Sequence, residues 1–383
     1  MFKMMIKMND EIEPRFVEEN FINLNPIQRG GVASLAARKA VISYVDGYSI
    51  CDYCPGCVNK IKKPPVEEFL TQVSEFLGMD YTILTNGCRE AVYAVFHSLL
   101  KPDDTIVVDA NRHYTTIVAA ENIGLRIFEI ENSGYPEFKI NPDNYQRVFD
   151  EIKNKTGKYP KLALLTHIDG SYGNLVDAKK VSKICNDYEI PFLLNAAYSS
   201  GRMAVNGKKL GADFIATSCH KGWAVGGGNA GFLSITEKWR DKILRVSKEY
   251  EAKQLEILGC STRGSVVPAL LASFPYVTER IKHWDEEVEK TRFFIKGAEK
   301  LGLKQLGEKP HNHDLVLLET KLFHDISKKH KKGGYFLYHE LRKRNITGIK
   351  PGLTKQFKAS IYGLNKEQIS YVLDAFKDII EGR

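Results

Sequence analysis

Short apolar runs alternate with amphipathic stretches along most of the chain. The runs are five to seven residues long, as in strands buried on both faces, and apolar residues recur at helical spacing between them. Strands are predicted at 81–87, 105–110, 126–130, 162–168, 191–197 and 214–220, and helices at 88–100, 114–123, 142–154 and 178–188. This order is typical of the α/β class, with a mainly parallel sheet that carries helices on both faces.

The rest of the chain has a different pattern. A strand and a long helix are predicted over 232–258, a helical region over 268–302, and short strands and helices at 314–320, 335–345, 356–362 and 365–380. The lysine-rich stretch 321–334 is predicted to be a solvated loop, with RNA contact as the alternative. We expect an N-terminal segment (1–60), a large α/β domain (61–270) and a small C-terminal α+β domain (271–383).

Composition narrows the class of protein. Hydrophobic residues make up 43% of the 383, enough for a sizeable core, and no apolar run approaches the about 20 residues that span a membrane. The first residues lack the apolar core and cleavage site of a secretory signal, so we expect a cytoplasmic protein without membrane contact. The net charge of +8 suits an anionic partner such as RNA, although a solvated basic surface is the simpler explanation.

The stretch 214–231 carries the clearest chemistry. A short apolar strand is followed by Ser218, His220 and Lys221 and then by a glycine-rich loop. Burial against the core would lower the pKa of Lys221 and make its amine a nucleophile toward a carbonyl group. The glycines at 226–228 would let the backbone approach a phosphate-bearing ligand closely. A lysine that merely caps a strand beside a flexible loop is the alternative.

Other polar residues stand just past predicted strand ends. Gly87, Cys88 and Arg89 begin a helix, where backbone N–H groups and the helix dipole favour an anion. Because the carboxyl ends of parallel strands meet at one edge of a sheet, the polar residues after later strands should converge on the lysine. These residues are His113, Tyr114, His167, Asp169, Asn195, Ser218 and His220. Each alone is more typical of a turn or a core, so the prediction depends on their shared position.

Three of the seven cysteines form a CxxCxxC motif around a Pro-Gly turn, which lets the thiols of Cys51, Cys54 and Cys57 converge. The odd count, in a chain without a secretory signal, argues against a disulfide framework. Such a loop can hold a metal, exchange a disulfide or carry a persulfide. A purely structural role is the remaining alternative.

The order of these features is similar to that of fold type I pyridoxal-phosphate enzymes over about 60–383. The thiol cluster and the motifs TNGCRE, HIDGSYGN, NAAYSSGRM, SCHKG and CSTRG resemble more narrowly the archaeal Sep-tRNA:Cys-tRNA synthase family. The resemblance implies a seven-stranded sheet, a homodimer and a transferase that makes cysteinyl-tRNA(Cys) from O-phosphoseryl-tRNA(Cys), beside the phosphoseryl-tRNA synthetase. In this β-replacement the α-proton and the phosphate leave, and sulfur adds to the β-carbon.

The resemblance also implies residue roles. Lys221 would bind pyridoxal 5′-phosphate covalently and then move the substrate's α-proton, His113 would stack on the pyridine ring, and Asn195 would face the ring nitrogen. Most relatives have aspartate where this chain has Asn195, and a neutral amide gives a weaker electron sink. The cofactor phosphate would be held by Gly87, Cys88, Arg89, Ser218 and His220, and the substrate by Arg89, Tyr114 and Arg263.

Sulfur delivery is assigned by the resemblance to Cys51, Cys54 and Cys260, as a persulfide, a disulfide partner or iron–sulfur ligands. Cys57 adds a further thiol for a cluster. The cysteine loop is expected to enter the active site of the other subunit of a dimer.

Two other functions compete. A cysteine desulfurase uses the same cofactor but acts on free cysteine, and it needs one mobile cysteine and no surface for tRNA. A nucleic-acid-binding protein with zinc at the cysteine loop would explain the charge, but not the polar residues expected around Lys221.

Overall fold

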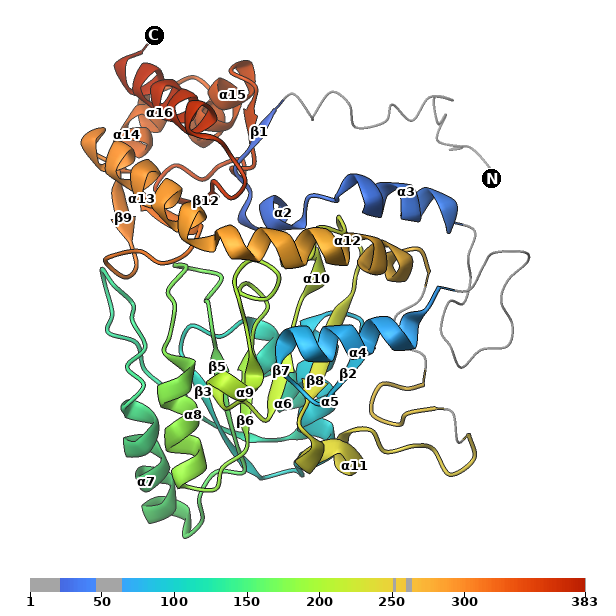
Figure 1. Cartoon of the computed structure of the whole chain (residues 1–383). Coiled ribbons are helices and arrows are strands. Elements are labelled where there is room, and N and C mark those ends of the chain that lie inside the picture. The colour runs from blue at the N-terminus through green and yellow to red at the C-terminus, as the bar shows by residue number, and fades with distance from the viewer. Residues whose placement is uncertain (1–20, 46–63, 251–252, 260–263, 383) are drawn as a thin grey trace, which may run out of the picture.

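The large sheet has seven strands in the order β2-β8-β7-β6-β5-β3-β4 in the computed structural model, which describes residues 21–45, 64–250, 253–259 and 264–382 (Figure 1). The strands are β2 (Tyr81–Thr85), β3 (Thr105–Asp109), β4 (Arg126–Ile130), β5 (Leu162–Thr166), β6 (Phe192–Asn195), β7 (Phe214–Ala216) and β8 (Gly231–Ile235). In this sheet β8 runs opposite to the other six strands. The mainly parallel seven-stranded sheet expected from the sequence is confirmed.

Both faces of this sheet are buried. Val107 of β3 and Leu194 of β6 belong to one apolar cluster, whereas their neighbours Val108 and Leu193 belong to the cluster on the opposite face. The first face is covered by α4 (Val66–Leu77), α7 (Asn144–Thr156), α8 (Ala178–Asp187) and α12 (Val266–Arg280), and the second by α5 (Cys88–Leu99) and α6 (Tyr114–Ile123). Burial on both sides explains why the strands read as unbroken apolar runs.

The small unit contains a three-stranded antiparallel sheet in the order β12-β10-β9. Its elements are β9 (Lys304–Leu306), β10 (Leu315–Glu319), β12 (Gln356–Ser360), α13 (Trp284–Lys300), α14 (Lys321–Lys329), α15 (Phe336–Lys343) and α16 (Lys366–Glu381). The N-terminal β1 (Ile22–Asn23) pairs in parallel with β11 (Ile346–Thr347), so the start of the described chain joins this unit. The domain boundaries expected from the sequence stay a prediction.

Two segments differ from their predicted structure. Among the described residues of 232–258, only η1 (Glu237–Trp239) and α11 (Arg240–Ile243) are helical. Tyr250 and Leu255 are 70% and 42% exposed, so they do not form the buried apolar face that a longer helix needs. The predicted loop 321–334 begins instead with α14, because Phe323 packs into the core of the small unit.

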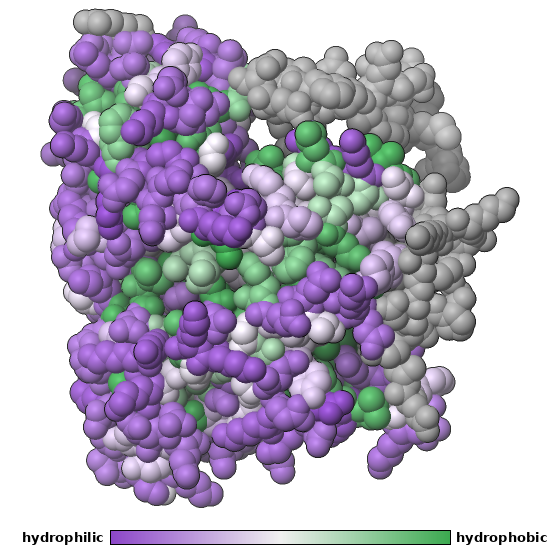
Figure 2. Space-filling model, viewed as in Figure 1, coloured by the Kyte–Doolittle hydropathy of each residue, from purple (hydrophilic) through white to green (hydrophobic). Residues whose placement is uncertain are grey.

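The surface has both hydrophilic and apolar areas. Figure 2 shows hydrophilic residues over most of the visible face and an apolar area over α2 (Pro26–Gly31), α3 (Leu35–Ser43) and α12. In this area Val32, Leu35 and Ile42 are 46%, 77% and 75% exposed. Among the helices of the described ranges, none has the length and apolar composition of a bilayer-spanning segment.

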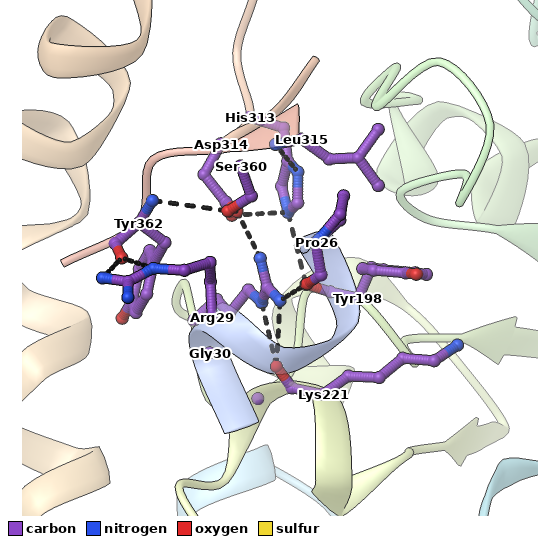
Figure 3. A network of polar contacts seen from close by, with 12 residues as sticks. Pro26, Arg29, Gly30, Tyr198, Lys221, His313, Asp314, Leu315, Ser360 and Tyr362 are labelled. Atoms are coloured by element: carbon purple, nitrogen blue, oxygen red, sulfur yellow. Dashed lines mark hydrogen bonds and ion pairs between the residues drawn. The ribbon is translucent and has the colours of Figure 1, made fainter. Parts of the chain in front are cut away.

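A buried arginine, Arg202, joins the large sheet, the small unit and the N-terminal segment, and Figure 3 labels its partners Pro26, Lys221 and Asp314. Arg202 donates to the Asp314 carboxylate and to the carbonyl oxygens of Pro26 (2.5 Å) and Lys221 (3.0 and 3.1 Å). Asp314 also accepts from Ser360 Oγ (2.5 Å). Burial raises the pKa of the Asp314 carboxyl, but the Arg202 guanidinium, His313 and the Ser360 hydroxyl together outweigh burial and lower that pKa to about 2.

Replacing this arginine is expected to destabilise the whole chain. Arg202→Met leaves the Asp314 charge buried without its partner, which costs about 3–5 kcal/mol in free energy of unfolding. The measurement is urea denaturation followed by circular dichroism. The matched control is Arg126→Met, which removes an exposed ion pair with Asp103 (3.0 Å) and should cost at most about 1 kcal/mol. Equal losses in the two variants would show that the buried arginine has no special structural weight.

Candidate functional site

Lys221 lies past the carboxyl end of β7, where the strand gives way to the short helix α10 (Cys219–Gly222). The strand predicted over 214–220 therefore ends four residues early, at Ala216. The Lys221 amine stands 4.2 Å from the centre of the Tyr198 ring, and its carbonyl is held by Arg202. Burial lowers the pKa of Lys221 to about 8, and the positive charges of Arg202 and Lys358 act in the same direction.

Several cationic and imidazole groups face Lys221. Burial lowers the pKa values of His113 and His220 to about 4, and the charges of Lys221 and Arg89 contribute to both shifts. Both imidazoles are therefore neutral at pH 7. Within the described residues, neither Lys221 nor Arg89 forms an ion pair with a carboxylate. Positive charge without a protein counter-ion favours an anionic ligand between these side chains.

The start of α5 provides backbone donors beside these cations. Gly87 is the N-cap of this 12-residue helix and has φ +93°, a conformation that favours glycine. A Cβ atom at this position would also come within 3.1 Å of the Asn229 side-chain oxygen. The backbone N–H groups at a helix start and the helix dipole favour an anion, as expected from the sequence.

Asn195 ends β6 and is buried. Its side-chain oxygen accepts from Cys88 Sγ (3.3 Å) and from the backbone N–H of Ala197 (3.1 Å), so the amide has only its N–H₂ group left to offer a ligand. Burial raises the pKa of the Cys88 thiol to about 12, which keeps it protonated. Cys88 thus orients Asn195, and its raised pKa leaves little thiolate near pH 7.

The remaining predicted residues lie around the same strand ends. Ser218 Oγ is 3.2 Å from the His220 ring, and His113 caps α6 with its Nδ1 2.8 Å from Thr115 Oγ1. The Tyr114 ring packs against that of His113, with centroids 4.4 Å apart, and is 66% exposed.

Two further residues of the site, Tyr198 and Lys358, were not identified from the sequence. Tyr198 lies in the NAAYSSGRM motif but was not singled out, although an aromatic residue after a strand end was a usable signal. Lys358 belongs to β12 of the small unit and donates to the carbonyl of Gly170 (2.7 Å) in the loop after β5. Nothing in the local sequence links Lys358 to Lys221, because the two lysines belong to different units and approach each other only in the folded chain.

Some predicted residues cannot be placed. Those outside the described residues are Cys51, Cys54, Cys57, Cys260 and Arg263. Among the described residues, no group of His, Cys, Asp and Glu is arranged to hold a metal ion.

Comparison with known proteins identifies the family. Residues 97–381 match the SepSecS family, described as O-phosphoseryl-tRNA(Sec) selenium transferase. The O-phospho-L-seryl-tRNA:Cys-tRNA synthase of Methanococcus aeolicus is 49% identical over 367 residues, which are 96% of this chain and 95% of that protein.

Comparison with solved structures supports the same family. One chain of a SepCysS–SepCysE N-terminal domain complex is 47% identical and superposes with a TM-score of 0.91 over 99% of both chains. A cysteine desulfurase from Thermococcus onnurineus NA1, at 19% identity, shares the fold with a TM-score of 0.74 over 95% of this chain and 96% of its own. The predicted fold type I class is confirmed. The chain therefore belongs to the O-phospho-L-seryl-tRNA:Cys-tRNA synthase family of transferases.

Proposed function

We propose that this protein converts O-phosphoseryl-tRNA(Cys) to cysteinyl-tRNA(Cys) by a β-replacement that depends on pyridoxal 5′-phosphate. The observation that carries the proposal is the buried Lys221 amine at the end of β7, whose pKa of about 8 leaves roughly a tenth of it neutral at pH 7, far more than for an ordinary lysine. Lys221 also lacks a carboxylate partner within the described residues. The 49% identity to a named synthase supports this substrate and product.

The groups around Lys221 fit a phosphorylated pyridoxal. The amine can bind its aldehyde, and the uncompensated cations and the first turn of α5 suit its phosphate. When bound, the cofactor supplies a conjugated ring that stabilises negative charge at the substrate's α-carbon. The residues that would hold it are Gly87, Cys88, Arg89, His113, Asn195, Ser218, His220 and Lys221.

Each group has a task that follows from its chemistry. The neutral His113 imidazole can stack on the ring, and the Asn195 amide can donate to an unprotonated ring nitrogen. Because its pKa lies near 8, Lys221 can take the substrate's α-proton as a general base. Arg89 is exposed and can hold the departing phosphate, with Tyr114 and Arg263 as further proposed substrate contacts.

Sulfur delivery is proposed for Cys51, Cys54 and Cys260, as a persulfide or as ligands of an iron–sulfur cluster that Cys57 would complete. Support comes from the free cysteines of the described chain. Burial raises the pKa of Cys88 to about 12, and the pKa values of Cys185 and Cys219 are also raised by burial. Thiolates form poorly at all three, so the nucleophilic sulfur is expected elsewhere.

The proposed partners are the tRNA and a second copy of the chain. The exposed apolar residues of α3 support a homodimer, because a monomer gains nothing from exposing them. A SepCysE-type protein is a further proposed partner, since the solved relative is in complex with one. Association with a phosphoseryl-tRNA synthetase stays a prediction.

The purified protein, reconstituted with pyridoxal phosphate, should convert O-phosphoseryl-tRNA(Cys) and sulfide to cysteinyl-tRNA(Cys). Lys221→Ala should lower the rate by roughly 10²–10⁴-fold, the usual contribution of a general acid–base group, measured by chromatography of the released amino acid. Lys158→Ala, at an exposed position after α7, is the matched control and should keep the wild-type rate. Alanine release from free cysteine, with no action on the tRNA, would contradict the proposal and favour a desulfurase.

The same assay tests sulfur delivery when thiosulfate and dithiothreitol replace sulfide, because a thiolate takes the outer sulfur of thiosulfate as a persulfide, sulfite leaves, and dithiothreitol reduces the disulfide that remains. Cys51→Ser, Cys54→Ser and Cys260→Ser should each lose cysteinyl-tRNA formation while binding pyridoxal phosphate normally, whereas Cys185→Ala should remain active. Full activity in all three serine variants would exclude these thiols.

The rate at which the apoprotein binds pyridoxal phosphate should depend on pH. Only the neutral amine attacks the aldehyde, and the folded protein lowers the pKa of Lys221 from 10.5 to about 8. The rate, followed by stopped-flow absorbance, should therefore rise with pH to a midpoint near 8 and then level off. A midpoint near the ordinary lysine value would show that the amine is not desolvated.

A further inference from the structure

The positive charge of the chain is concentrated in one segment. Residues 321–358 contain 11 Lys and Arg against 2 Asp and Glu, whereas the whole chain has a net charge of only +8. The rest of the protein is therefore close to neutral. A strongly basic segment within a nearly neutral chain indicates that an anionic partner binds at this segment. A charge that served only solubility would be spread over the whole surface.

This segment folds back on itself in the small unit. Thr320, just before α14, donates its N–H to the carbonyl of Lys355 (2.8 Å). Gly334 lies against Gly352, since a Cβ atom at Gly334 would stand 3.3 Å from the Gly352 oxygen. The start of α14 and the two glycine-containing turns therefore lie side by side.

Few acidic residues accompany the lysines brought together here. The two acids of the segment are occupied, because Asp325 pairs with Lys328 (3.4 Å) and Glu340 with Lys343 (2.7 Å). The exposed lysines of the segment that form no ion pair within the described part of the chain include five at the start of α14 and beside the two turns. We call them the basic surface: Lys321, Lys331, Lys332, Lys350 and Lys355.

An aromatic side chain accompanies these lysines. Tyr335 is 57% exposed and follows Lys332 by three residues, next to the turn that contains Gly352. Exposed lysines with an exposed aromatic ring favour RNA over an acidic protein, because the lysines bind phosphates and the ring can stack on an unpaired base.

A single lysine connects the basic surface to the site. Lys358 stands three residues after Lys355 on β12, is accessible to solvent, and reaches the carbonyl of Gly170 (2.7 Å). Partial burial and the charge of Lys350 lower the pKa of Lys358, and Lys358 in turn contributes to the lowered pKa of Lys221. Cations therefore continue from the exposed turn at Lys350 to the reactive amine.

We propose that the basic surface binds the phosphate backbone of the tRNA next to its aminoacylated end, and that Lys358 guides that end to Lys221. This inference rests on the proposed function, which supplies the tRNA as substrate. The lysines of the basic surface would act by sequence-independent phosphate contacts, and Tyr335 by stacking.

The test is binding of unacylated tRNA(Cys) transcript to the reconstituted full-length protein, measured by filter binding at several salt concentrations. The triple variant K332Q/K350Q/K355Q should weaken binding about tenfold or more, and the slope of log affinity against log salt should fall by about one per lysine. The control triple K158Q/K161Q/K179Q removes the same charge from exposed lysines of the large domain and should bind like wild type. Circular dichroism and pyridoxal phosphate content confirm that both variants are folded.

The outcomes separate the two proposals. If the wild-type protein does not bind the transcript, the proposed function itself fails. If the wild-type protein binds but the two triple variants behave alike, the basic surface is not the RNA site and only the further inference falls. Unchanged tRNA binding with loss of an acidic protein partner would likewise overturn it, in favour of a protein-docking role.

Discussion

The Arg202 guanidinium is the contact on which the arrangement of the site depends. It is fully buried, and its donors reach the Lys221 carbonyl of the large sheet, the Pro26 carbonyl of the N-terminal segment and the Asp314 carboxylate of the small unit. A buried guanidinium needs acceptors for all its N–H groups. If the large sheet, the N-terminal segment or the small unit shifted, at least one buried N–H group would lose its acceptor. The peptide that carries the reactive lysine is thereby fixed from outside its own strand.

The positive charges around the lysine follow a second constraint. Lys221, Arg89 and Lys358 come from different elements. Within the described residues, none of them forms an ion pair with a carboxylate. Such an arrangement costs stability unless an anion is bound. In the function we propose, the phosphorylated cofactor and the phosphorylated substrate would both supply that anion, and the same charges would serve binding and departure of phosphate.

Much of this was predictable, for a physical reason. Strands buried on both faces need unbroken apolar runs, and the carboxyl ends of parallel strands share one edge, so Lys221 and Asn195 could be placed together from the sequence. The contacts of Arg202 and Lys358 were not predictable, because their partners lie far away in sequence. The helix predicted to end near residue 258 was wrong. The residues there favour a helix locally, but such a helix would have no apolar face to bury against the domain. Instead Glu256 pairs with Arg245 (2.5 Å) of the same segment and with His97 of α5 (2.6 Å), which holds the segment against the large sheet's helices.

The most direct test is borohydride reduction of the protein reconstituted with pyridoxal phosphate, followed by peptide mass mapping. The account predicts an absorbance band of lysine-bound pyridoxal that borohydride bleaches, with the phosphopyridoxyl mass fixed on the peptide that contains Lys221. Lys221→Ala should show neither. A label on another lysine, or a wild-type protein that stays colourless after reconstitution, would contradict the central claim that Lys221 is the reactive amine.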